Sequence, residues 1–327
     1  MSAEASILQV EGVSKRFPVR RGLLLRRTVG YVHAVTDVSF ALRAGETLGV
    51  IGESGCGKTT LARLVLGLEP VSGGSIRFRG HPLEKGVPAD VRRHMQMVFQ
   101  DPHGSLDPRM TVQGILEEPL RVHTRLPAGE KKRHVIEVLQ QVGLSAQALR
   151  AFPHEFSGGQ RQRIAIARAL ITSPDVLICD EIVSALDVSI QAQIINMLKR
   201  LQRERHLSYL FVSHDMAVVR HISDRVLVMY LGRCMEIADK KRLFGTPLHP
   251  YTKALLAAVP VPDPTADKQL KPLPGETPSP IQVPPGCPFQ TRCHLAYDRC
   301  RSEVPVLTDA GGGHRVACHL FQRQELT

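Results

Sequence analysis

The sequence has no tryptophan, and aromatic residues make up only 5% of its 327 residues. A surface that stacks single-stranded nucleic acid depends on aromatic rings, so this composition argues against one. The sequence also has no apolar run near the roughly 18 to 20 residues that cross a bilayer. Its first residues, MSAEASILQVEGV, lack the basic region and the apolar core of a secretion signal, so we expect a cytoplasmic protein.

Acidic residues are scarce relative to basic ones. The chain has 42 lysines and arginines and 31 aspartates and glutamates, which gives a formal net charge of +11 and an isoelectric point near 9.6. This balance suits nucleic acid, an anionic membrane surface or a phosphate ligand equally well, so the net charge selects no function. Residues 20–32 contain four arginines around three leucines. We interpret them as a solvated loop between two strands or, alternatively, as a contact with phospholipid or a partner.

The hydrophobic pattern up to about residue 260 alternates between short apolar runs and helical periodicity. Such alternation is typical of an α/β architecture. We expect buried strands at residues 47–51, 176–179, 209–212 and 226–229, and helices at 59–66 and around 190–201. Between residues 110 and 172 the pattern is mostly helical, which predicts a helical insertion in the α/β core.

The C-terminal part of the chain has a different composition. Ten of the 23 prolines lie between Pro260 and Pro288. This density excludes a long helix or a central strand, so we expect an extended arm. Four of the seven cysteines, Cys287, Cys293, Cys300 and Cys318, lie in the last 41 residues. In a cytoplasmic protein such a cluster favours metal binding over disulfides.

Residues Gly52–Thr59 read GESGCGKT and match the phosphate-binding pattern G-x-x-x-x-G-K-[ST] in full. The motif follows an expected buried strand and opens an expected helix, which is where its mechanism requires it. Its glycines allow backbone N–H groups to surround phosphate oxygens, and the helix N-terminus adds a positive dipole end. Lys58 can then reach the β- and γ-phosphates, and the Thr59 hydroxyl can ligate Mg²⁺.

Two other segments have groups that suit a nucleotide. Asp180 and Glu181 follow an expected buried strand, where one carboxylate can hold Mg²⁺ and the other can polarise an attacking water. A charge pair at a helix start is the structural alternative. Residues 157–160, Ser-Gly-Gly-Gln, open a basic helix and offer a second anion site built from backbone donors, or else an ordinary surface loop.

These segments occur in the order found in the ATP-binding subunits of ABC transporters, a family that the sequence resembles. Phe156–Leu170 matches the family's signature motif. Gln100 matches its Q-loop, Ser184–Asp187 its D-loop and His214 its switch histidine. Phe17 stands where the family has an adenine-stacking aromatic residue, with Tyr31 as the alternative.

The resemblance implies an α/β fold of the ABC-type P-loop ATPase class, with a RecA-like core, a β-subdomain and a helical subdomain. We expect the nucleotide-binding domain at residues 6–258, with the helical subdomain at about 101–175. Residues 259–327 are then expected to form a Pro-rich, Cys-containing C-terminal extension.

In this family two subunits pair head to tail, and ATP lies between the phosphate loop of one and the signature motif of the other. The resemblance implies Glu181 as the catalytic base and His214 as a contact to the γ-phosphate. The implied Mg²⁺ ligands are Thr59, Gln100 and Asp180. The implied nucleotide contacts are Phe17, Gly52, Glu53, Ser54, Gly55, Cys56, Gly57, Lys58, Thr59, Thr60, Gln100, Ser157, Gly158, Gly159, Gln160 and Asp187. Ile182 departs from the family's usual proline, which we expect to leave the turn after Glu181 less rigid.

The cysteine-containing tail resembles the C-terminal extension of dipeptide and oligopeptide importer ATPases, as do Gln100–Pro108 and His249–Thr252. The resemblance implies ATP hydrolysis that powers peptide import at the cytoplasmic face of the inner membrane. The implied partners are two permease subunits, a second and different ATP-binding subunit, and a periplasmic or lipid-anchored peptide-binding protein. No nucleic acid partner is implied.

In that subfamily the four cysteines are associated with a [4Fe-4S] cluster, and four thiolates saturate such a cluster. Their spacings of five, six and 17 intervening residues fit neither a zinc ribbon nor the bacterial ferredoxin run. We favour an iron–sulfur cluster, with zinc and unliganded thiols as the alternatives.

Other functions fit the same ATPase core. One alternative is an importer of another small solute, such as nickel or glutathione. A nucleic-acid maintenance ABC ATPase is another, but such proteins carry long coiled coils or zinc-module insertions. The sequence has neither a sustained heptad pattern nor paired C-x₂-C motifs.

Overall fold

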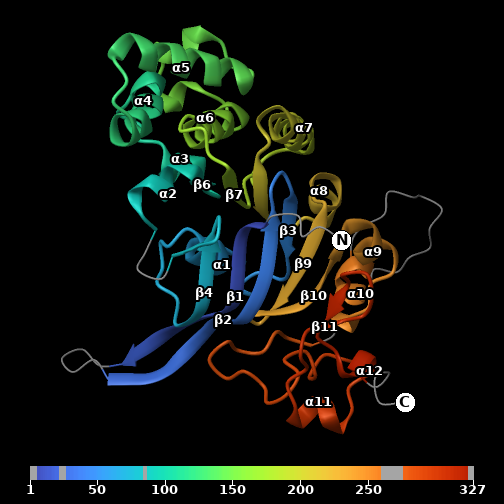
Figure 1. The fold of residues 1–327 in the computed structure, drawn as a ribbon. Helices are drawn as coiled ribbons and strands as arrows, with labels where there is room; N and C mark the ends of the chain where they lie inside the picture. Colours follow the sequence, from blue (N-terminus) through green and yellow to red (C-terminus); the bar gives the residue numbers. More distant parts are fainter. Residues whose placement is uncertain (1–5, 22–26, 84–86, 259–274, 323–327) are drawn as a thin grey trace.

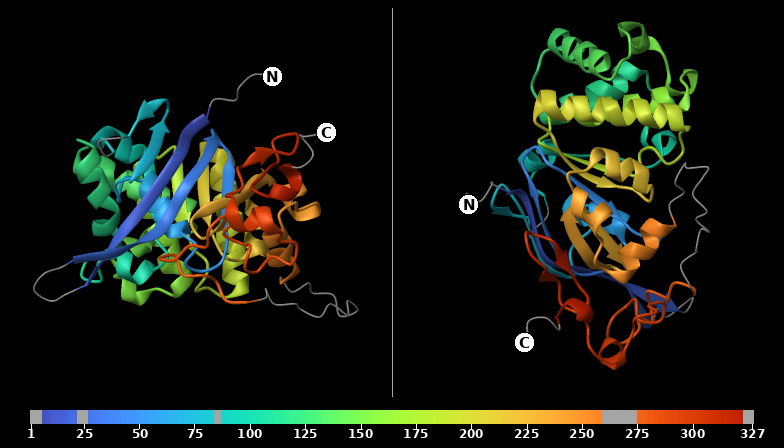
Figure 2. Two further views of the ribbon diagram at one scale, coloured as in Figure 1. Left: turned by 90° about the horizontal axis from the view of Figure 1, so that it is seen from below. Right: turned by 90° about the vertical axis from the view of Figure 1, so that its right-hand side faces the viewer.

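The structure is a computed structural model that describes residues 6–21, 27–83, 87–258 and 275–322. It has a lobe of helices at one end, two β-sheets in the middle and an irregular C-terminal segment, residues 275–322, at the other end (Figure 1). The right-hand view in Figure 2 gives the same order of the three parts. None of the helices in the described ranges is long and apolar enough to span a bilayer.

The smaller sheet is antiparallel, with the strand order β2-β1-β4-β5. Its strands are β1 (Ser6–Arg21), β2 (Arg27–Arg43), β4 (Gly73–Phe78) and β5 (His81–Pro82). β1 and β2 pair as far as Arg21 with Arg27 and project from the molecule as a long arm (Figure 1).

This arm corrects the loop expected at residues 20–32. Residues 20–21 and 27–32 belong to the paired strands, while residues 22–26 lie outside the described part of the chain. Pairing between the two strands satisfies the backbone groups that face the partner strand, and the arginine side chains Arg20, Arg21 and Arg27 are exposed to solvent. A run of exposed charges is therefore compatible with an extended strand pair.

The larger sheet has the strand order β11-β12-β10-β9-β3-β8-β7-β6. Its strands are β3 (Thr47–Ile51), β6 (Met95–Val98), β7 (Val176–Asp180), β8 (Ser208–Val212), β9 (Arg225–Tyr230), β10 (Arg233–Asp239), β11 (Thr308–Asp309) and β12 (Arg315–Val316). The strands from β9 to β6 in this order are parallel to their neighbours. The four strands expected from the sequence are confirmed within one residue at each end.

The parallel strands are apolar on both faces because both faces are covered. Along β7, Val176 and Ile178 face a core shared with the smaller sheet, whereas Leu177 and Cys179 face a second core on the opposite side. Helix α1 (Lys58–Val65) belongs to the first core and lies between the two sheets. Helices α7 (Val188–Arg205) and α8 (Met216–Ile222) contribute to the second core.

The helical lobe occupies most of the chain between β6 and β7. Its helices are α3 (Pro102–Ser105), α4 (Val112–His123), α5 (Ala128–Gln141) and α6 (Gly158–Leu170), with two 3₁₀ turns, η1 (Ala146–Arg150) and η2 (Pro153–Glu155), while the short helix α2 (Ala89–His94) precedes β6. Thr111 caps α4 by accepting the Gly114 N–H. The helical character expected between residues 110 and 172 is confirmed.

After β10 the chain continues through helices beside the larger sheet into the irregular C-terminal segment (Figure 1). The remaining helices are α9 (Lys240–Gly245), α10 (Pro250–Ala257), α11 (Asp298–Ser302) and α12 (His319–Gln322). The C-terminal segment has little regular structure but adds β12 to the larger sheet, where Val316 pairs with Glu236 of β10. Much of the proline-rich arm expected between Pro260 and Pro288 lies outside the described residues, which resume at residue 275.

A buried carboxylate fastens the C-terminal segment to the sheet. Glu236 is fully buried and accepts hydrogen bonds from the Leu248 and His249 N–H groups and from Nε2 of His314 at 2.6 Å. Burial raises the pKa of Glu236, but the His314 and backbone hydrogen bonds outweigh this effect and lower the pKa overall. The stabilisation is therefore present above the carboxyl's unfolded pKa and is lost as the pH falls through its lowered folded value.

We predict that His314→Ala lowers the free energy of unfolding by about 1–3 kcal/mol, because the buried Glu236 carboxylate loses the hydrogen bond from His314. Thermal and urea denaturation of the purified chain measure this loss. Glu303→Ala removes an exposed i,i+4 ion pair from the same segment and serves as a control with little change. Equal losses in both variants would contradict this role of the buried pair.

Candidate functional site

The candidate residues gather at one edge of the larger sheet. The phosphate loop, residues 52–57, follows β3, and Gln100 follows β6 after one intervening residue. Glu181 directly follows β7, and His214 follows β8 after one intervening residue. Since these four strands are parallel, their carboxyl ends meet at one edge, which is where open α/β sheets bind ligands.

The phosphate loop requires glycine at its close approaches to the rest of the chain. Gly57 has φ +106°, and a Cβ there would lie 2.1 Å from the Ala34 carbonyl oxygen. At Gly52 a Cβ would lie 2.2 Å from the Met229 carbonyl oxygen. The loop therefore packs against backbone on two sides, and it turns directly into α1 at Lys58.

Lys58 is the first residue of α1, and its side chain is buried against the loop. Its Nζ donates to the carbonyl oxygens of Gly52 at 2.9 Å and Glu53 at 3.0 Å. The next residue, Thr59, donates from its hydroxyl to Oδ1 of Asp180 at 3.1 Å. Burial raises the pKa of Asp180, against the lowering effect of the Thr59 hydrogen bond. A hydroxyl and a carboxylate in contact at a phosphate loop are suitable ligands for Mg²⁺.

Glu181 lies among three other candidate residues. Its Oε2 accepts a hydrogen bond from Gln100 Nε2 at 3.1 Å and lies 3.4 Å from His214 Nδ1. Its Oε1 lies 4.0 Å from Lys58 Nζ. The structure thus brings together Gln100, Glu181 and His214, which are far apart in the sequence, beside the phosphate loop.

Ile182 is the residue directly after Glu181. Glu181 has φ +49°, in the left-handed region, and Ile182 is 2% exposed in the core shared by α6 and α7. The Ser184 N–H and hydroxyl both donate to the Glu181 carbonyl oxygen, at 3.1 and 2.9 Å. Side-chain burial and these two hydrogen bonds are the contacts that support the turn after Glu181.

Ser157 and Asp187 have local roles as helix caps in the single chain. The Ser157 hydroxyl accepts the Gln160 N–H, and the Gln160 side chain accepts the Ser157 N–H, which forms a capping box at the start of α6. Asp187 accepts hydrogen bonds from the Ile190 N–H and the Ser189 hydroxyl, which lower its pKa. Both residues therefore stand at helix N-termini, where backbone N–H groups favour anions.

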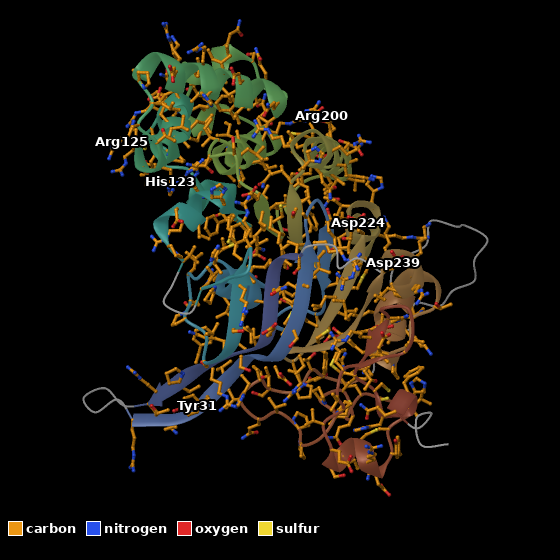
Figure 3. The ribbon with its side chains drawn as sticks, viewed as in Figure 1. Tyr31, His123, Arg125, Arg200, Asp224 and Asp239 are labelled. Carbon is orange, nitrogen blue, oxygen red and sulfur yellow. The ribbon has the colours of Figure 1, made fainter. Side chains whose placement is uncertain are left out.

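The two aromatic candidates lie on the arm. Phe17 of β1 is half-buried, with Lys15 Nζ 4.8 Å from its ring centroid, and it pairs with Val32 of β2. Val32 is two residues from Ala34, whose carbonyl approaches Gly57 of the phosphate loop. Tyr31 is 50% exposed and lies farther along the arm (Figure 3). The register therefore places Phe17 nearer than Tyr31 to the phosphate loop.

Three residues at this site were missed by the sequence analysis. Arg292 and Thr277 of the C-terminal segment contact the Glu53 carboxylate, and the Tyr251 hydroxyl accepts the Glu53 N–H at 3.0 Å. Tyr251 lies in the segment His249–Thr252, which the family resemblance marked without a role. Nothing in the local sequence around Arg292 or Thr277 indicates a contact more than 200 residues away.

The four C-terminal cysteines line one narrow cavity of about 20 Å³. All four are free thiols, and burial raises the pKa of Cys287 to about 12 and that of Cys318 to about 11. His249 and His319 also line the cavity. Within the described ranges, however, no three histidine, cysteine, aspartate or glutamate side chains are arranged closely enough to hold a metal ion.

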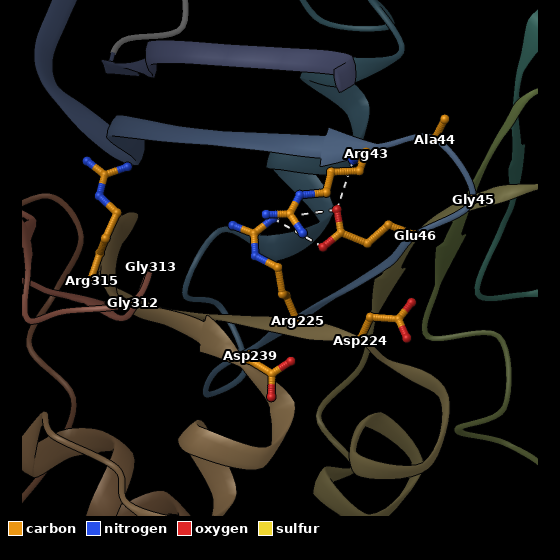
Figure 4. Close-up of a pocket in the computed structure, with 10 residues that line it drawn as sticks. All are labelled: Arg43, Ala44, Gly45, Glu46, Asp224, Arg225, Asp239, Gly312, Gly313 and Arg315. Atoms are coloured by element: carbon orange, nitrogen blue, oxygen red, sulfur yellow. Dashed lines mark hydrogen bonds and ion pairs between the residues drawn. The ribbon is translucent and has the colours of Figure 1, made fainter. Parts of the chain in front are cut away.

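A larger pocket of about 780 Å³ lies away from this site. Its lining includes Arg43, Glu46, Asp224 and Arg225, at the amino-terminal ends of β3 and β9, opposite to the phosphate loop (Figure 4). The Arg225 guanidinium donates to the Glu46 carboxylate at 3.1 Å, so part of the lining is already paired. Because ligands bind at the carboxyl ends of parallel strands, this pocket is not the nucleotide site.

Comparisons with known proteins agree with this geometry. Residues 35–184 match the family described as ABC transporter, and residues 235–300 match that described as the oligopeptide/dipeptide transporter, C-terminal region. Among solved structures, the dimeric ABC transporter cassette MJ0796 has a TM-score of 0.63 at 25% identity and covers 71% of this chain and 98% of its own. CbiO1 of Clostridium perfringens has a TM-score of 0.64 at 28% identity, with coverages of 74% and 92%. The fold and the site therefore define an ATPase of the ABC class.

Relatives that match over nearly the whole of both chains define the family within this class. The oligopeptide transport ATP-binding protein AppF of Bacillus subtilis is 50% identical over 97% of this chain and 98% of its own length. The dipeptide transport ATP-binding protein DppF of Escherichia coli is 46% identical, with coverages of 98% and 96%. The chain belongs to the family of ATP-binding subunits of oligopeptide and dipeptide ABC transporters.

We predict that Gly57→Ala lowers the free energy of unfolding by roughly 2–5 kcal/mol, from left-handed strain plus the clash with the Ala34 carbonyl. Gly55→Ala is the matched control, because Gly55 also has positive φ but no atom within 4 Å of an added Cβ. Gly55→Ala should lower the free energy of unfolding only by the backbone strain, about 1–2 kcal/mol. Urea denaturation of both variants measures the difference, and equal losses would argue against the close approach.

Proposed function

We propose that this chain is the ATP-hydrolysing subunit that powers the uptake of dipeptides or oligopeptides through a membrane transporter. The observation that carries the proposal is the convergence of Gln100, Glu181 and His214 beside the phosphate loop. Hydrolysis of a γ-phosphate requires a positioned base, a charge clamp and Mg²⁺, and each has a candidate at this edge of the sheet.

In the proposed mechanism Glu181 is the general base that polarises the attacking water. Lys58 and the loop N–H groups bind the phosphates. Thr59, Gln100 and Asp180 would hold Mg²⁺, which would neutralise charge on the phosphates. His214, 3.4 Å from the Glu181 carboxylate, contacts the γ-phosphate. Gln100 links the site to the helical lobe, because the chain enters that lobe directly after it.

The proposed active unit contains two ATP-binding subunits. The helix N-terminus at Ser157, Gly158 and Gly159 supplies anion-binding groups that a single chain uses only for capping. In a head-to-tail pair this terminus completes the pocket around the phosphate loop of the opposite subunit, and Asp187 lies at the junction. We propose a second, different ATP-binding subunit as the partner.

A groove between the helical lobe and the sheets is the proposed docking site for the permease subunits. It has a volume of about 580 Å³, and its lining includes the exposed apolar residues Leu68, Phe99 and Val122. His123, at the base of the helical lobe in Figure 3, also lines it. Phe99 directly precedes Gln100, so a helix of a permease in this groove would act on the ATP site. Two permeases and a peptide-binding protein complete the proposed assembly, which places this chain at the cytoplasmic face of the inner membrane.

We predict that Glu181→Gln lowers kcat for ATP hydrolysis by about 10²- to 10⁴-fold, because it removes the base. ATP binding should persist, so the variant should accumulate bound ATP in the assembled transporter. Phosphate release and filter binding measure the two effects. Glu204→Gln, an exposed change on α7, is the control with unchanged hydrolysis. Near-normal turnover by Glu181→Gln would refute the assignment of the base.

We further propose that residues 259–327 form a C-terminal extension whose four cysteines hold a [4Fe-4S] cluster. Four free thiols line a single cavity, which is the donor set that such a cluster takes. The cavity of about 20 Å³ is narrow, so the segment would have to open around the cluster. Since the described residues 275–322 have little regular structure, a bound cluster would stabilise them.

We predict that the anaerobically purified protein is brown, with broad visible absorption that Cys287→Ser removes. Cys234→Ala is the matched control, because Cys234 is buried on β10 outside the cysteine cavity. The protein with Cys234→Ala should remain brown. A colourless anaerobic preparation that contains one zinc per chain would contradict the cluster and support a zinc site.

A further inference from the structure

The C-terminal segment contacts the phosphate loop through a two-bond ion pair. Arg292 donates from Nη1 to Oε2 of Glu53 at 2.7 Å and from Nη2 to Oε1 at 2.9 Å. The Arg292 side chain is 4% exposed and that of Glu53 is 22% exposed. Two parallel bonds between a guanidinium and a carboxylate fix the orientation of both groups as well as their distance.

Glu53 is held by two other groups from the same side of the loop. The Thr277 hydroxyl donates to its Oε2 at 2.9 Å, and the Tyr251 hydroxyl accepts its backbone N–H at 3.0 Å. Burial raises the pKa of Glu53, but the hydrogen bonds from Arg292 and Thr277 outweigh this effect and lower the pKa overall. Glu53 therefore carries a negative charge at neutral pH.

A negative charge in this loop opposes the binding of a polyphosphate. Glu53 follows Gly52 directly, and Lys58 Nζ donates to the carbonyl oxygens of both residues. The charge of Lys58 is among the causes that lower the pKa of Glu53, so this carboxylate lies within electrostatic range of the phosphate-binding lysine. It would therefore repel the phosphates of ATP, and its partial burial weakens screening by water and salt. Arg292 supplies the opposite charge at hydrogen-bond distance.

The same part of the C-terminal segment also packs against Tyr251, whose hydroxyl accepts the Glu53 N–H of the phosphate loop. The Phe289 ring centroid lies 5.3 Å from that of Tyr251 and 5.4 Å from that of Tyr230. Phe289 and Arg292 both lie between Cys287 and Cys293, so one short stretch of chain reaches the loop by an aromatic contact and by an ion pair.

We propose that Arg292 is a positioning residue for nucleotide binding: by pairing with Glu53 it holds the phosphate loop and cancels the loop's negative charge. This role rests on the proposed function only in that the loop binds ATP. It does not require a metal in the cysteine cavity. The C-terminal segment then sets the affinity of the ATP site from outside the ATPase core.

The test is an equilibrium titration of the purified full-length chain with a fluorescent ATP analogue and Mg²⁺. Arg292→Ala is expected to raise Kd by about tenfold, because it leaves the Glu53 charge unpaired. Glu53→Gln is expected to bind more tightly than the wild-type chain. The double variant, Arg292→Ala with Glu53→Gln, should recover most of the lost affinity, since no unpaired carboxylate remains.

Arg299→Ala is the matched control. Arg299 lies next to Cys300, as Arg292 lies next to Cys293, but it pairs with the exposed Glu303 at 2.7 Å and not with the loop. Its Kd should equal that of the wild-type chain. Arg292→Lys keeps the charge without the two-bond geometry and should give an intermediate Kd, which provides a second reading should Arg292→Ala not fold.

Two results would overturn this role of Arg292. One is a wild-type Kd for both Arg292 variants, and the other is a double variant that binds as weakly as Arg292→Ala, which would point to a purely structural effect. Raising the salt concentration should also reduce the defect of Arg292→Ala, because the repulsion is electrostatic. A wild-type chain that binds no ATP analogue at all would instead contradict the proposed function itself.

Discussion

The parallel pairing of β3 with β8, of β8 with β7 and of β7 with β6 is the constraint on which the site depends. It brings the ends of four strands to one edge, although the residues after them are up to about 160 positions apart in the sequence. A single antiparallel strand in this series would carry its terminal residue to the opposite edge. The pairing also places Lys58 and Glu181 4.0 Å apart, close enough for both to act on one phosphate group.

Much of the ATPase core could be predicted from the sequence because its signals are local. The strands β3, β7 and β8 are each five consecutive buried residues, so their places were predicted within one residue. The phosphate loop and the Asp180–Glu181 pair were recognised for the same reason. The contact of Glu181 with Gln100 and His214 follows once the strands are known to be parallel.

The parts that could not be predicted depend on contacts between distant segments. The run of arginines in residues 20–32 was interpreted as a loop because charge indicates exposure to solvent but does not exclude a strand that is exposed on both faces. Arg292 is 239 residues from Glu53, and neither residue has a local feature that indicates the other. The four cysteines were recognised as a group, and the structure places them around one cavity, but their spacing does not specify the geometry that a metal would need.

The short strands β12 and β11 extend the larger sheet beyond β10, so β10 is not its outermost strand. Val316 pairs with Glu236, a residue about 80 positions earlier, so the protecting strand is synthesised well after the strand that it covers. At a synthesis rate of roughly 5–20 residues per second, one row of N–H and C=O groups on β10 has no partner strand for several seconds or more. An open row of this kind can recruit a strand from a neighbouring nascent chain. Removal of β11 and β12 would make that exposure permanent, so these two short strands protect the protein against aggregation as well as completing the sheet.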